Sequence, residues 1–380
     1  MNSHVSYNTF TQKIYNQVSI ENDQNLVISP ISLFMSLLIC YAGSKGKSYN
    51  QLGKLLDISR QLDHQTFSYN HNFLSYTQQF SAQNLKLSLA NRVYLQNGFK
   101  IEQNFLHTVN SMFTGSLQQL DFTNSQKSAK AINDWVASRT NNKIKQAINP
   151  DSLNAATRLV LVNAIYFKAN WALLFDEETT FKEDFFVSDG SKVKVPMMRI
   201  YDEYFKHLFK PANIDASTIE IPFSDRNFAM TIILPDQRFS LSHVERQLNA
   251  ANVQKIISLN MIKEPMNIFI PKFSISSDLD LKKIVEKLGA ESLFGRFANF
   301  SGISSKNGLL ISDIVHKTSF EMDENGAEAS GSTAINFGLY SEREFVHYQR
   351  INFVCNRPFM FVIHEKTYNN VLFIGKFVRP

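Results

Sequence analysis

The sequence predicts one mixed α+β domain, with helices early in the chain and strands late. Helix-type spacing of apolar residues dominates the first part, and short β-branched or aromatic segments dominate the second part. There is no strict strand–helix alternation, which would indicate a doubly wound sheet. The 380 residues include only 14 Gly and 10 Pro, so little material is left for a flexible linker. We therefore expect a single domain over residues 1–380.

The composition allows a large core and excludes several classes of protein. Hydrophobic residues make up 44% of the chain, including 32 Phe, and charged residues 19%, which excludes a disordered chain. The net charge of +5 is too small to indicate nucleic acid as a partner. Cys40 and Cys355 lie in apolar runs, so we expect free buried thiols. Zinc-type Cys/His spacing and known catalytic motifs are missing, and we predict no catalytic residue, metal or cofactor.

The first helices are predicted from apolar spacing. Apolar side chains recur every four residues at the start of the chain, at Phe10, Ile14 and Val18. The most apolar segment, 26–43, is about long enough to span a bilayer. Polar residues and a proline interrupt it, so we expect a core helix over 33–41, with Ser32 as candidate N-cap, and no membrane contact.

The later elements follow in order. Alternating LKLSL predicts a half-buried strand from residue 85, and a helix follows around Ile132 and Val136. The run LVLVNAIYF at 159–167 is nearly all apolar and predicts a central strand covered on both faces. In the second half a helix at 281–288 ends at Gly289, and strands are predicted at 228–235, 266–273, 359–363 and 371–378.

A long segment at 326–350 has no helix signal. Its length of about 25 residues exceeds the roughly 12–15 at which structureless loops become uncommon in compact domains. Its first half alternates between a face of small residues and a polar face that begins with Glu328 and Ser330. Such a strand could slide between two others without overpacking a sheet, although a polar loop shows similar alternation by chance. The small face consists of Ala327, Ala329, Gly331 and Thr333.

A series of motifs in fixed order resembles the serpins, a family of serine protease inhibitors. The longest is SDIVHKTSFEMDENGAEAS at 312–330. The others are NLVISPIS (25–32), NAIYFKANW (163–171), VPMM (195–198), IPKF (270–273), FSGIS (300–304), NRPF (356–359) and LFIGKF (372–377). Because the motifs extend over nearly the whole chain, the resemblance is much more specific than any single match.

The resemblance implies a serpin fold of three β-sheets and about nine helices, with an exposed reactive-centre loop. It also implies a mechanism, in which a target serine protease attacks the loop and forms an acyl-enzyme on its own serine. The cut loop then inserts as an extra strand in the main sheet and distorts the protease. The catalytic residues would belong to the partner, so we expect a monomer that is not an enzyme.

The hinge and loop correspond to residues 324–350. Small residues occupy the inward hinge positions, whereas non-inhibitory relatives tend to have bulky or charged ones there. Family spacing from Glu324 places the scissile bond between Tyr340 and Ser341, which suits a chymotrypsin-like protease. Leu339, for chymotrypsin- or elastase-like enzymes, and Arg343, for trypsin-like ones, stay open because the loop is lengthened. The hinge residues are Glu324, Gly326, Ala327, Glu328, Ala329, Ser330, Gly331, Ser332 and Thr333.

Other positions match residues with structural roles in the family. Trp171 resembles the aromatic residue where the loop enters the sheet, and ordinary core packing is the alternative interpretation. The segment 64–84 contains no Lys or Arg, so we expect no heparin activation through it. The residues that match the region where the main sheet parts are Ser29, Pro30, Ser32, Asn163 and His316.

Two other functions and the compartment stay open. The chain could be a non-inhibitory serpin acting as a carrier or chaperone, or a cross-class inhibitor of cysteine proteases. The first 20 residues contain no continuous apolar stretch, so no cleavable signal peptide is visible. The segment 26–43 could act as an uncleaved export signal, which keeps both cytoplasmic and extracellular action open.

Overall fold

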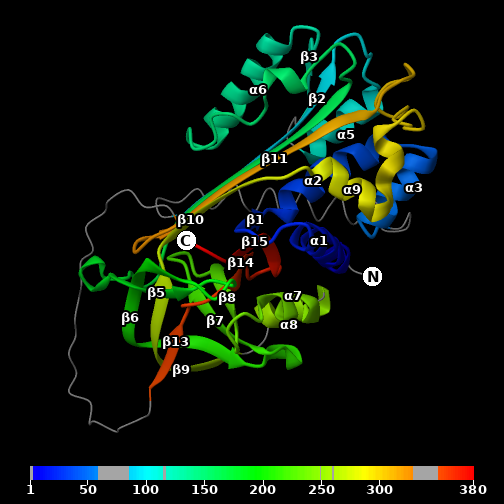
Figure 1. Ribbon diagram of the computed structural model, residues 1–380. Helices are drawn as coiled ribbons and strands as arrows, with labels where there is room; N and C mark the ends of the chain where they lie inside the picture. The colour runs from blue at the N-terminus through cyan, green and yellow to red at the C-terminus, as the bar shows by residue number, and fades with distance from the viewer. Residues whose placement is uncertain (1–2, 59–84, 114–116, 249, 259–260, 328–349) are drawn as a thin grey trace.

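A computed structural model describes residues 3–58, 85–113, 117–248, 250–258, 261–327 and 350–380 (Figure 1). This part of the chain combines eight α-helices with two hydrogen-bonded sheets, which confirms the α+β class. The helices are α1 (Ser3–Ile20), α2 (Pro30–Gly43), α3 (Gly46–Leu55), α5 (Gln103–Met112), α6 (Ser125–Arg139), α7 (Leu241–Gln247), α8 (Ala250–Ser258) and α9 (Leu281–Val285). Short 3-10 or π turns are η1 (Pro150–Ser152), η2 (Glu177–Thr179), η3 (Pro211–Asn213), η4 (Glu286–Ala290) and η5 (Glu291–Phe294).

The six-stranded sheet contains the predicted central strand. β4 (Leu159–Asn170) lies antiparallel to β2 (Leu85–Gln96) and parallel to β11 (Ile311–Met322). Residues 159–167 of β4 are all buried, as the run of apolar residues predicts. The strand order is β10–β11–β12–β4–β2–β3, with β3 (Leu117–Leu120), β10 (Phe273–Asp278) and β12 (Gly326–Ala327).

The nine-stranded sheet joins two of the three expected sheets into one hydrogen-bonded unit. The cause is β6 (Lys192–Phe209), which pairs with β5 (Phe181–Phe186) near its start and with β7 (Ala216–Pro222) near its end. β9 (Ile262–Pro271) runs along both parts of β6. The remaining strands are β1 (Leu26–Ile28), β8 (Phe228–Pro235), β13 (Ile351–Val354), β14 (Phe359–Glu365) and β15 (Asn370–Phe377).

Two apolar clusters cover opposite faces of the six-stranded sheet. Successive side chains of a strand point to opposite faces. Val160, Val162 and Ala164 of β4 pack in one cluster with α6, whereas Leu161 and Ile165 belong to the main core. Figure 1 shows α6 on one side of this sheet and α1 and α2 on the other. The even-numbered positions of β4 therefore face α6, and the odd-numbered positions face the main core.

Some predicted boundaries are wrong. Helix α2 begins at Pro30, so Ser29 is the N-cap and the predicted cap, Ser32, is buried inside the helix. The fixed φ of proline suits the first helical position, which moves the start upstream. The strand predicted at 266–273 is divided at Lys272 between β9 and β10, which lie in different sheets. No helix in the described ranges is long and apolar enough to cross a membrane.

The last predicted helix is also shorter than its apolar pattern. The pattern at 281–288 predicts one regular helix, but α9 ends at Val285 and the chain continues as the π turn η4. Gly289 inside this turn has a φ of 90°, a left-handed conformation that favours glycine. Gly289 therefore ends the helical segment as predicted, but the last residues form a π turn and not the regular α-helix that the pattern predicts.

His316, in the six-stranded sheet, and His364, in the nine-stranded sheet, are two of the buried histidines. The Nε2 of His316 accepts a hydrogen bond from the Ser29 N–H at 3.2 Å, and that of His364 lies 2.9 Å from the Thr231 hydroxyl. Burial lowers the pKa of each imidazole to about 4, because the charged form would lose its hydration. Both side chains therefore stay neutral in the folded protein at a pH where exposed histidines become protonated.

We expect the free energy of unfolding to fall as the pH drops from about 6.5 to about 4. In this window the unfolded histidines bind protons that the folded ones do not, so acid favours the unfolded chain. The cost is on the order of 3 kcal/mol for each histidine. Urea unfolding at a series of pH values measures the slope. His364→Gln should flatten it and the exposed His107→Gln should not; equal slopes in all three proteins would contradict this origin.

Candidate functional site: a gap between two strands

Strands β4 and β11 pair along only part of their length. The parallel pairing runs from Leu159 and Ile311 to Ile165 and Thr318. Further along, β12 lies between them, antiparallel to both. Among the described residues, no strand fills the space between 166–168 of β4 and 319–321 of β11. We call these two facing segments the strand gap.

Gly326 fixes how β12 enters the gap. Its backbone pairs with Asn170 and has a φ of 148°, a conformation that side chains rarely adopt. A Cβ atom at this position would lie 2.1 Å from the carbonyl oxygen of Ala169. Only glycine therefore allows the chain to turn from β11 back against β4.

A buried ion pair holds the turn that precedes β12. Glu324 is 4% exposed, and its Oε2 lies 2.8 Å from the Lys272 Nζ, at the break between β9 and β10. Burial raises the pKa of Glu324, but its hydrogen bonds, first that to Lys272, and the charge of Lys272 together outweigh burial, so the pKa lies below its usual value. The carbonyl of Glu324 also accepts from the Phe175 N–H at 3.0 Å. Glu324 is therefore fixed as a carboxylate by both side chain and backbone.

Trp171 lies directly after β4 and anchors the same turn. It is 2% exposed and stacks on Phe223, with ring centroids 4.7 Å apart and planes 7° from parallel. Its indole Nε1–H donates to the Asp323 carbonyl at 3.0 Å, and its backbone N–H donates to the Asn325 carbonyl at 2.9 Å. The structure thus places Trp171 where the segment after β11 turns back into the sheet.

A buried polar cluster lies below the gap, under the paired part of the strands. His316 of β11 stands opposite Asn163 of β4 and accepts from the Ser29 N–H. The Asn163 Nδ2 donates to the Val315 carbonyl at 3.2 Å, and its Oδ1 accepts from the Ser36 hydroxyl. Polar side chains thus meet at the β4–β11 seam in an otherwise apolar core, where the Ser29 hydroxyl and the His316 Nδ1 have no hydrogen-bond partner among the described residues.

Sequence reasoning finds some members of this cluster and misses others. Ser29, Asn163 and His316 belong to this cluster, and Pro30 follows Ser29 as the first residue of α2. Ser32 instead donates to Asn91 of β2, a residue that the sequence does not single out. Ser36 is one of the polar residues that interrupt the apolar segment 26–43. Its spacing of four residues from Ser32 puts both hydroxyls on one face of α2, and that spacing is the signal that could have identified it.

The arrangement supports no nucleophilic chemistry within the described ranges. Cys40 and Cys355 are free and buried, and burial raises the pKa of each thiol. What the geometry offers is a place for an additional strand. The hinge residues beyond Ala327 and the candidate scissile residues lie outside the described residues: Glu328, Ala329, Ser330, Gly331, Ser332, Thr333, Leu339, Tyr340, Ser341 and Arg343. The segment 64–84 lies outside them too.

Comparison with known proteins identifies the family. Residues 5–380 match the family described as Serpin (serine protease inhibitor). Human Serpin B3 is 31% identical over 399 residues, an alignment that covers 100% of both chains. The crystal structure of Serpin48 from the insect Tenebrio molitor has a TM-score of 0.87 and 29% identity, and covers 100% of this chain and 98% of that one.

A relative of a different kind shares the same fold. Human thyroxine-binding globulin, solved with its ligand bound, has a TM-score of 0.87 and 26% identity, covering 99% of this chain and 98% of that one. Similarity in fold therefore does not by itself separate inhibitors from carriers. The family match over nearly the full length, together with these similarities, shows that the chain belongs to the serpin family.

Proposed function

We propose that this chain is a suicide-substrate inhibitor of serine proteases that traps its target by loop insertion into the strand gap. The observation that carries the proposal is the register of β12. Gly326 pairs with Asn170 and Ala327 with Ala169, so the first residues of the hinge are already aligned with β4. Continuing this register would bring residues 328–330 opposite 166–168 of β4, within the gap, and the residues after them would enter only where the β4–β11 pairing separates.

If the register continues, each hinge side chain would point to a defined face of the sheet. Ala329 would stand opposite Phe167, Gly331 opposite Ile165 and Thr333 opposite Asn163. Cross-strand partners point to the same face, and these β4 positions face the main core. The small face of the hinge would therefore be buried, and Glu328, opposite Lys168, would point to the side of α6. A hinge with large side chains at the odd-numbered positions would be resisted by the packed core.

Insertion would begin after the protease has bound covalently to the loop through its own catalytic serine. The protease serine oxygen would attack the carbonyl carbon of Tyr340, the bond to the Ser341 nitrogen would break, and the new amino group would take up a proton. The freed hinge side could then enter the gap as a strand, which would add strand pairing between β4 and β11 there. The attached protease would be displaced before water releases it.

An SDS gel and a melting curve together test the proposed function. Mixing with a chymotrypsin-like protease should give a band of the summed mass that survives SDS. Cleavage of the loop by a protease that is not trapped should raise the melting temperature, because the inserted strand adds pairing and burial. A chain that is only clipped, with an unchanged melting temperature, would contradict inhibition and favour a carrier function. Repeating the gel with a papain-like protease tests cross-class inhibition.

The register predicts opposite results for two neighbouring substitutions. Ala329→Arg would place a charge in the core during insertion, at a cost of several kcal/mol, on the order of the penalty for an unpaired buried polar group. Slower insertion lets the acyl-enzyme hydrolyse, so this variant should become mainly a substrate. Glu328→Arg introduces the same side chain on the opposite face and should keep most of the inhibition. The ratio of complex to cleaved chain on a gel measures both, and equal ratios would contradict the register.

The scissile bond is tested by the fragment that the complex releases. A fragment that begins at Ser341 would support Tyr340 as the residue recognised by a deep apolar primary pocket. A fragment that begins at Tyr340 would assign the bond to Leu339. A fragment that begins at Glu344 would assign it to Arg343 and indicate a trypsin-like target. Mass spectrometry of the fragment distinguishes the three without any assumption about loop geometry.

A further inference from the structure

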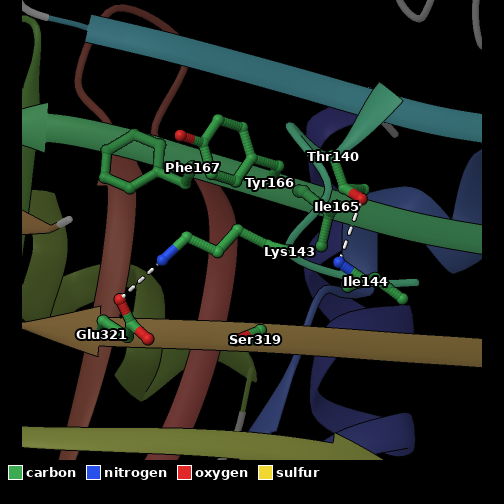
Figure 2. A pocket seen from close by; sticks show the side chains of 8 residues that line it. All are labelled: Thr140, Lys143, Ile144, Ile165, Tyr166, Phe167, Ser319 and Glu321. Atoms are coloured by element: carbon green, nitrogen blue, oxygen red, sulfur yellow. Dashed lines mark hydrogen bonds and ion pairs between the residues drawn. The ribbon is translucent and has the colours of Figure 1, made fainter. Parts of the chain in front are cut away.

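Two cavities of the structure differ greatly in size. The one beside the strand gap has a volume of about 10 Å³, room for about one water molecule. Figure 2 shows the Lys143 side chain reaching across it to Glu321. The other has a volume of about 420 Å³, which falls within the roughly 300–1,000 Å³ of small-molecule sites. We call it the α7 cavity, because the first residues of α7 form part of its wall.

Four segments that are distant in the sequence surround the α7 cavity. They are the loop after α1, the turn after β5, the start of α7 together with Phe239 before it, and the end of β15. None of the lining residues belongs to β4, β11 or β12, so a ligand here would bind outside the strand gap.

A buried ion pair forms one part of the wall and leaves one carboxylate oxygen free. Lys376 is 3% exposed, and its Nζ lies 3.2 Å from the Glu245 Oε1. The hydroxyls of Tyr15 and Ser19 donate to the same oxygen, at 2.9 Å and 2.5 Å. The other oxygen, Oε2, has no hydrogen-bond partner among the residues that the structure describes. Because Glu245 lines the cavity, its Oε2 is available to a donor on a ligand.

Carboxylates outnumber cations around the cavity by three to two. Asp23 is exposed and forms no ion pair within the described ranges. Asp189 lies close enough to Arg379 for the two charges to attract each other. With Lys376 paired to Glu245 and Arg379 offsetting Asp189, one negative charge remains without a partner. The cavity therefore favours a ligand that carries one positive charge.

Apolar side chains make up another part of the wall. Val187, Leu241 and Val378 line the cavity and are themselves buried. Phe239 lines it too, but this side chain is 50% exposed and its backbone has a φ of 66°. A bulky residue is uncommon in this left-handed conformation, and such strained residues gather at ligand sites. The exposed ring offers an aromatic surface to a ring on the ligand.

We propose that the α7 cavity binds an aromatic amine, a small molecule with one ring and one protonated amino group. The amino group would donate to the Glu245 Oε2, in a cavity that Asp23 also lines. The ring would lie against Phe239 and Leu241, where burial of apolar surface favours it. A carboxylate ligand would meet an oxygen that only accepts hydrogen bonds, so the site selects against acids. This binding activity goes beyond the proposed inhibition and does not depend on it.

The probe for binding is para-fluorophenethylamine, whose fluorine NMR line broadens when it binds the full chain. For a ligand of about ten non-hydrogen atoms we expect a dissociation constant of about 1 mM. The alcohol in which a hydroxyl replaces the amino group should bind about tenfold more weakly, because it lacks the charge. The acid para-fluorophenylacetate should not bind. An amine that does not bind, or that binds no better than the alcohol, would overturn the proposal.

Substitutions in the cavity wall test where the amine binds. Ser242→Trp adds a large side chain at the exposed start of α7, which lines the cavity, and should abolish binding. The double variant Glu245→Gln with Lys376→Met removes both charges of the buried pair and should weaken binding by about tenfold. As the matched control, Asp151→Asn removes an exposed carboxylate in η1 and should leave the affinity unchanged.

Circular dichroism shows whether each variant is folded before its affinity is measured. If the double variant does not fold, Ser242→Trp decides the site, because Ser242 is exposed and lies outside the buried pair. An unchanged affinity in folded Ser242→Trp would place the amine elsewhere and overturn the proposal. The SDS-stable complex with a protease is a separate measurement, so failure of the α7 cavity and failure of the proposed function are distinguishable.

Discussion

The incomplete pairing of β4 with β11 is the constraint on which the rest of the molecule depends. Two long central strands that pair over only part of their length leave room for a further strand between them. The parallel pairing stops at Ile165 and Thr318, and β12 enters from the far end. Gly326, Glu324 and Trp171 fix the turn through which β12 enters at one end of the gap. At the other end, β4 and β11 pair directly with each other.

The polar cluster below the gap places hydrogen-bonding side chains at one point of the β4–β11 seam. Apolar packing between β4 and β11 resists separation, because parting the strands would expose apolar side chains or leave a cavity in the core. Neutral hydrogen bonds of Asn163 and His316 can instead be exchanged for others as the strands move. Burial keeps His316 uncharged, so its Nε2 remains an acceptor for the Ser29 N–H. The Ser36 hydroxyl of α2 thus reaches the seam at Asn163, among apolar strand pairs such as Val162 and Val315.

The fold could be predicted from the sequence where one local pattern decides the structure. The apolar run at 159–167 forms the buried β4, and the spacing of Phe10, Ile14 and Val18 forms α1. Contacts between distant segments could not be predicted in this way. Lys272 lies within a quoted motif, yet nothing local indicates that it pairs with Glu324, 52 positions away. Lys143 is one lysine in a polar stretch, and its partner Glu321 is 178 positions away.

The fold alone does not decide what this serpin does, because thyroxine-binding globulin and Serpin48 resemble it to the same degree by TM-score. The hinge provides the discriminating physical argument. Continued beyond Ala327, the register of β12 would assign the odd-numbered hinge residues to the core, and those residues are small. A carrier would not need small residues at those loop positions that would face the core beside β4. Agreement between two independent features, the period-two sequence and the β12 register, is what a loop selected for insertion would show.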